Sequence, residues 1–188
     1  MDALTTNLVE QLDWHWTQQA RPRLDGLTDE EYLWEPVAGT WSARPRSAAP
    51  PPSVTARAGG GDWQLDWADP EPDPAPVTSI AWRLGHVVVG VLGTRAHSHF
   101  GGPPADILGW DYAGTAAEAL DQLDAAYAAW SAGVRGLDEE GLRRPVGPAE
   151  GPWADAPMLT LVLHINREVI HHLAEVALLR DLWANGLR

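Results

Sequence analysis

The segment from Ile80 to Leu92 constrains the fold most, because apolar residues cover nearly every side of it when it is drawn as a helix. Thr78 or Ser79 precedes the segment in the position of an N-cap residue. A helix that is apolar all round must be covered by neighbouring elements. The segment therefore predicts a buried helix, with the other helices of the chain packed around it.

Three further segments show helical periodicity. The first spans about residues 4–24, where leucine, tryptophan and alanine recur every fourth position. Another spans about residues 115–134 and begins with Thr115 and Glu118, the spacing of a capping box. The last runs from about Pro157 to Trp183. Four helices joined by one long crossover predict an all-α four-helix bundle, a fold whose ligand sites lie between facing helices.

The long crossover between the first and second helices, residues 33–76, is rich in proline and glycine. A structureless connection of this length is unusual. The crossover also carries the tryptophans Trp34, Trp41, Trp63 and Trp67, which favour order because disordered segments are poor in aromatic residues. We expect a short β-hairpin that pairs residues 53–56 with residues 63–67. The chain is predicted to be one domain over residues 1–188, with residues 34–76 as an insert that covers the functional site.

Composition excludes several classes of function. The chain has no cysteine, so it has no disulfide, thiolate metal ligand or cysteine nucleophile. It has no lysine, which excludes Schiff-base chemistry and a Walker-type phosphate loop. A net charge of −13 disfavours nucleic acids and anionic membranes as partners. Without a recognisable secretory signal or an apolar stretch of membrane length, we expect a cytoplasmic protein with small-molecule partners.

A carboxylate and an imidazole are predicted to point into the bundle from the fourth helix. Glu168 and His172 fall in the middle of the stripe of that helix that should face the core. The stripe is marked by Leu161, Ile165, Val176, Leu179 and Trp183. Burying these two polar side chains without binding partners would cost a large desolvation free energy. Two side chains one turn apart on a helix can hold one metal ion. His86 of the second helix is a candidate partner, and Gly90 and Gly93 on the same side leave space for a ligand.

The same residues also fit a structural interpretation. A single buried histidine is more often a hydrogen-bonded core residue than a ligand, and Glu168 with His172 could form an exposed ion pair if the helix phase differs. Other ionisable residues are expected at the edge of the site or on the surface: His164, His171 and Glu175 on the flank of the stripe, and His15, His97 and His99 elsewhere.

Several motifs together resemble one family. They are IAWRLGH at residues 80–86, HINREVIHHLAEVALLRD at 164–181, PRLDGLTDEE at 22–31 and WEPVAGTWSARP at 34–45. The chain thereby resembles the DinB-like superfamily of four-helix-bundle metalloenzymes, and its actinobacterial branch most, over all but about residues 46–62. The resemblance implies a divalent metal bound by His86, Glu168 and His172. Many members carry His-x3-His on the last helix, whereas a His/Glu/His set resembles the mycothiol-dependent maleylpyruvate isomerases.

Two imidazoles and one carboxylate leave a coordination position open, which is typical of catalytic sites. A metal ion lowers the pKa of a bound water or thiol, so the set predicts either hydrolysis or thiol chemistry. Related isomerases and transferases use mycothiol or bacillithiol, and a chain without cysteine would need such an outside thiol. The leading hypothesis is a thiol-dependent S-transferase or isomerase that acts on a small electrophile, with Arg44 or Arg83 receiving an anionic group.

Two alternatives use the same ligands. One is a metal-dependent hydrolase, and the other is a non-catalytic metal-binding or small-ligand-binding stress protein. The donor set suits zinc, nickel and iron alike, and zinc is the expected ion. The resemblance further implies a homodimer.

Overall fold

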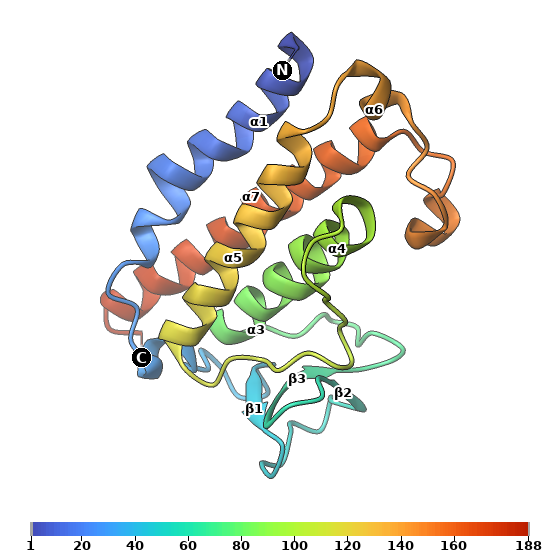
Figure 1. The fold of residues 1–188 in the computed structure, drawn as a ribbon. Coiled ribbons are helices and arrows are strands. Elements are labelled where there is room, and N and C mark those ends of the chain that lie inside the picture. The colour runs from blue at the N-terminus through green and yellow to red at the C-terminus, as the bar shows by residue number, and fades with distance from the viewer. Residues whose placement is uncertain (1, 188) are drawn as a thin grey trace.

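The structure is a computed structural model that describes residues 2–187, and most of them are helical (Figure 1). The longer helical elements are α1 (Ala3–His15), α3 (Ile80–Gly85), η3 (His86–Gly93), α4 (Thr94–Phe100), α5 (Ala116–Arg135) and α7 (Met158–Ala184). The short ones are η1 (Trp16–Ala20), η2 (Pro22–Leu24), α2 (Asp29–Tyr32), α6 (Glu139–Arg143) and η4 (Pro148–Trp153). This architecture confirms the predicted helical bundle. Within residues 2–187, no helix has both the length and the apolar character needed to span a bilayer.

The second helical run is continuous from α3 through η3 to α4, and its interior is buried as predicted. Ser79 Oγ accepts a hydrogen bond from the Trp82 amide at 3.2 Å, which confirms Ser79 as the N-cap. Ala81, Leu84, Val87, Val89 and Leu92 are each 0% exposed. The η3 portion is a π-helix, a conformation that often marks functional sites. Its wider turn moves the side chains after His86 away from the positions that an α-helix would give them.

The helices pack so that the middle of the second run meets α7. α7 contacts α1, α3 and η3, while α5 contacts α1, α4 and η3. The start of η3 therefore lies against α7, and the bundle encloses the second run on several sides. The first run extends α1 through the π-turn η1 and the 3-10 turn η2 to Leu24, which matches the predicted limit.

The crossover contains a three-stranded antiparallel sheet of β1 (Ala43–Pro45), β2 (Ala56–Ala58) and β3 (Trp63–Trp67), in the order β1-β3-β2. The predicted hairpin is confirmed as β2 paired with β3, although its first strand begins only at the end of the range 53–56. β1 was missed because three residues are too few to show alternation. The sheet lies beside the start of α3 (Figure 1). There, the Trp82 indole N–H donates to the Asp66 carbonyl oxygen at 2.8 Å.

One glycine of α5 permits close packing of α4. A Cβ atom at Gly133 would lie 2.1 Å from Cδ2 of Phe100. We expect Gly133→Ala to lower the free energy of unfolding by about 1–3 kcal/mol, despite the higher helix propensity of alanine. Urea denaturation measures the change. Gly141→Ala in α6 is the control, because its Cβ would meet only the side chains of Leu137 and Asp138, at 3.1 and 3.3 Å. If Gly133→Ala and Gly141→Ala have the same free energy of unfolding, the close packing of Phe100 on Gly133 is contradicted.

Candidate metal centre

His86 and His172 face each other across the contact between the second helical run and α7. Their ring centroids are 4.8 Å apart and their planes are inclined by 87°. Two imidazoles on one tetrahedral zinc ion, with Zn–N distances of about 2.1 Å, have ring centres about 5 Å apart. The spacing of the two rings therefore fits two ligands of a single ion.

Glu168 adds a carboxylate to this pair from one turn earlier on α7. Its Oε2 atom lies 3.4 Å from Nε2 of His172, and its side chain is 26% exposed. The prediction that Glu168 lies in the middle of the core-facing stripe is wrong, because the neighbouring Val169 is the fully buried residue. α1 and α3 both pack against α7 and widen its buried face, which places Glu168 at the edge of that face. The carboxylate thus gives the site a side that solvent can reach.

The His86 imidazole is held in a form that can bind a metal. Burial, followed by the electrostatic influence of His172 and Arg83, lowers the pKa of His86 to about 4, so the ring is neutral at pH 7 and keeps a lone pair. The ring stacks on Trp82 at 5.3 Å between centroids. Among residues 2–187, no side chain or backbone group forms a hydrogen bond with it. This environment differs from that of a hydrogen-bonded core histidine.

The glycines that follow His86 have separate roles. A Cβ at Gly90 would lie 3.1 Å from Nδ1 of His86, so Gly90 leaves room for that ring. A Cβ at Gly93 would instead meet the Val88 carbonyl oxygen at 2.7 Å and the Ala105 side chain at 3.1 Å. The prediction that both glycines leave space for a ligand is therefore wrong for Gly93, because the π-helix alters its direction.

The other side of the His172 ring carries a charged cluster. Nδ1 of His172 lies 2.9 Å from Oε2 of Glu175, and the same oxygen accepts from Arg83 at 3.1 Å. An N–H at Nδ1 can donate to this carboxylate and leave Nε2 with its lone pair directed toward Glu168. Metal-binding histidines are commonly oriented by a carboxylate in this way. Glu175 and Arg83 thus fix the ring of His172 for binding through Nε2.

A second group of possible metal ligands overlaps the first. His171, His172 and Glu175 each offer a ligand atom, and these atoms lie within 4.8 Å of one another. Nδ1 is the nitrogen of His172 that lies 2.9 Å from Glu175, and the Arg83 guanidinium lies 3.2 Å from the same nitrogen. A divalent ion there would face a fixed positive charge at short range. The His171 side chain is also 62% exposed. Arg83 therefore disfavours an ion at Nδ1, whereas on the Nε2 side the nearest arginine, Arg167, lies 3.6 Å from Oε1 of Glu168.

The comparisons with known proteins agree with this architecture. A family model described as the DinB superfamily matches residues 11–176. The chain belongs to the DinB superfamily. The matched range contains both groups of possible ligands, the first formed by His86, Glu168 and His172 and the second by His171, His172 and Glu175. Searches of the curated proteins and of the solved structures found no match. Membership in a particular branch of the DinB superfamily stays a prediction.

The two arginines predicted to receive an anion lie in different surroundings in this DinB protein. Arg83 is in the charged cluster beside His172, and burial lowers its pKa from the usual value. Arg44 is on β1, where its guanidinium makes ion pairs with Glu35 at 2.6 Å and with Asp66 at 2.7 Å. The charge of Arg44 is thus already compensated by two carboxylates within the fold.

His15, His97 and His99 lie outside the centre. His97 and His99 contact different groups: Nδ1 of His97 lies 3.0 Å from the Gly102 carbonyl oxygen, and Nε2 of His99 lies 2.9 Å from Glu150. His15 was predicted on the surface, but it is buried at the junction of α1 and η1. The adjacent tryptophans did not reveal this burial.

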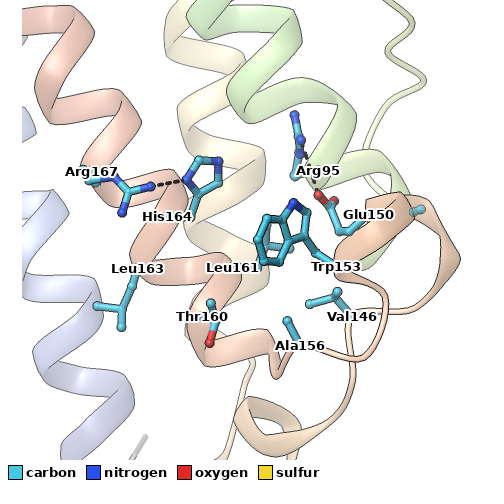
Figure 2. A pocket seen from close by; sticks show the side chains of 11 residues that line it. Arg95, Val146, Glu150, Trp153, Ala156, Thr160, Leu161, Leu163, His164 and Arg167 are labelled. Carbon is cyan, nitrogen blue, oxygen red and sulfur yellow. Dashed lines mark hydrogen bonds and ion pairs between the residues drawn. The ribbon is translucent and has the colours of Figure 1, made fainter.

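Sequence reasoning did not find a cavity of about 730 Å³ between α4, η4 and α7 (Figure 2). Its wall contains Arg95, Val146, Ala149, Glu150, Trp153, Ala156, Thr160, Leu161, Leu163, His164 and Arg167. The η4 residues carry no periodic pattern, so their approach to α4 and α7 could not be predicted. The nearest signal was the flank position of His164 on the fourth helix.

Proposed function

We propose that this DinB protein is a divalent-metal-dependent enzyme that holds its ion with His86, Glu168 and His172. The observation that carries the proposal is the perpendicular His86–His172 pair at 4.8 Å, with the Glu168 carboxylate 3.4 Å from Nε2 of His172. Three such ligands leave at least one coordination position open, as catalytic zinc sites do. Zinc is the expected ion, and nickel or iron suits the same donors.

The proposed reaction is S-transfer or isomerisation that depends on a small thiol of the mycothiol type. A bound divalent ion supplies Lewis acidity, which favours the deprotonated form of a thiol or water at the open position. The chain has no cysteine, so a thiol nucleophile must come from outside the protein. Glu175 and Arg83 hold the His172 ring in place, while Trp82 covers one face of His86 and keeps solvent from it.

Metal removal tests this proposal. We expect purified protein to contain about one equivalent of zinc or another divalent ion by elemental analysis. It should conjugate mycothiol to a model electrophile, lose this activity with a chelator and recover it when zinc is added back. A protein that does not bind any divalent ion would contradict the proposal. Chelator-sensitive hydrolysis of an activated ester without thiol would instead identify a hydrolase, and bound metal without turnover would identify a binding protein.

A further inference from the structure

We propose that the cavity between α4, η4 and α7 binds a small organic carboxylate with an apolar, aromatic-sized body, as the reaction partner of the metal centre. This inference rests on the proposed function for the partner's role in the reaction, but the binding itself depends on the residues of the cavity. The volume of about 730 Å³ lies within the usual range for small-molecule sites.

The cavity wall has more arginines than carboxylates, although the protein is acidic. Its wall has two arginines and one glutamate, whereas the whole chain has a net charge of −13. Figure 2 shows the arginines on opposite walls, Arg95 from α4 and Arg167 from α7. Glu150 is paired with Arg95 at 3.3 Å and with His99 at 2.9 Å, so it compensates one arginine. Arg167 forms the longer ion pair, 3.6 Å to Oε1 of Glu168, so it is the arginine that a monoanionic ligand can bind.

Arg167 is the cation available to that ligand. Its guanidinium donates to Nδ1 of His164 at 2.6 Å, and it lies 3.6 Å from Oε1 of Glu168, beyond hydrogen-bond length. A divalent ion on Glu168 would neutralise that carboxylate and weaken its attraction for Arg167. Guanidinium groups bind carboxylates through two parallel hydrogen bonds, so a carboxylate is the matching anion.

The rest of the wall matches an apolar body. Trp153 is 72% exposed and Leu163 is 52% exposed, and both belong to the wall. Large apolar side chains that line a concave surface while exposed are typical of ligand sites. The flat indole of Trp153 suits a ring or another planar group.

The cavity also reaches the proposed metal ligands. His164 and Arg167 lie 3.5 and 3.6 Å from Glu168. Arg95 donates to the carbonyl oxygen of Gly90, the residue next to the His86 ring. A carboxylate held at Arg167 would therefore place the remainder of the ligand next to the metal centre.

Calorimetric titration with 1-naphthoate and with neutral 1-naphthalenemethanol tests the cavity. We expect naphthoate to bind more tightly, and Arg167→Gln to weaken it about tenfold without changing the binding of the alcohol. Arg143→Gln is the matched control, because that side chain is 75% exposed and lies outside the cavity. Trp153→Ala should weaken both probes, and circular dichroism verifies that each variant is folded. Equal binding of the two probes, or unchanged naphthoate affinity in Arg167→Gln, would overturn the proposal.

The titrations are made on chelator-treated and on zinc-loaded protein, which separates this proposal from the proposed function. Arg167-dependent naphthoate binding in a protein that fails to bind zinc would support the cavity and contradict the metal-dependent enzyme. If the protein binds zinc but Arg167→Gln does not change its preference for naphthoate over the alcohol, the proposed carboxylate site is contradicted. The metal centre is then still supported.

Discussion

Replacing His172 with alanine is expected to lower zinc affinity by about 100- to 1000-fold, because it removes one ligand of a site built from few. His172 is the residue shared by both possible ligand groups, so its loss should abolish stoichiometric binding in either case. Competition titration of zinc-loaded protein against a chromogenic chelator measures the affinity. Retention of wild-type affinity would contradict the metal centre.

The neighbouring residue His171 provides the matched control and decides between the two sides of the ring. We expect His171→Ala to retain wild-type zinc affinity, because its exposed ring lies on the Nδ1 side with Arg83. Glu175→Gln should lower affinity only about 10- to 100-fold, since Glu175 orients His172 without binding the ion. If His171→Ala loses zinc while His86→Ala keeps it, the ion lies on the Nδ1 side.

The sequence predicted the helical framework because helical spacing and caps are local properties. Ile80 to Leu92 could only be a buried helix, and Glu168 and His172 had to share one side of the last helix. These two facts, with the resemblance, were enough to select His86. The approach of His86 to His172 could not be derived, because it depends on how α7 packs against η3.

The parts that were missed depend on contacts between distant segments. Arg83 meets Glu175 only when α3 packs on α7. The relative position of two packed helices cannot be derived from a single sequence. The π-helix after His86 changes the direction of Gly93, and the α-helical period cannot represent it. Trp153 lies in an irregular turn, so its place in the cavity wall becomes visible only in the folded structure.

The hydrogen-bonded pair of Arg44 and Asp66 gives the second large effect, this time on stability. Asp66 is 0% exposed, and its Oδ2 accepts from Arg44 at 2.7 Å and from the Ser42 amide at 3.0 Å. Removing the arginine leaves a buried carboxylate without its countercharge, which typically costs about 3–5 kcal/mol. We expect Arg44→Ala to lower the free energy of unfolding by that amount and the melting temperature by roughly 6–20 °C.

The control and the rescue separate this structural role from a role in binding an anion. Arg143→Ala removes an exposed ion pair to Glu139 and should change the free energy of unfolding by less than about 0.5 kcal/mol. The double variant Arg44→Ala, Asp66→Ala should regain part of the lost stability, because it also removes the orphaned carboxylate. Below its melting temperature, Arg44→Ala should bind zinc and naphthoate as the wild type does. A stable Arg44→Ala variant with weakened naphthoate binding would instead support Arg44 as the receiver of an anionic group.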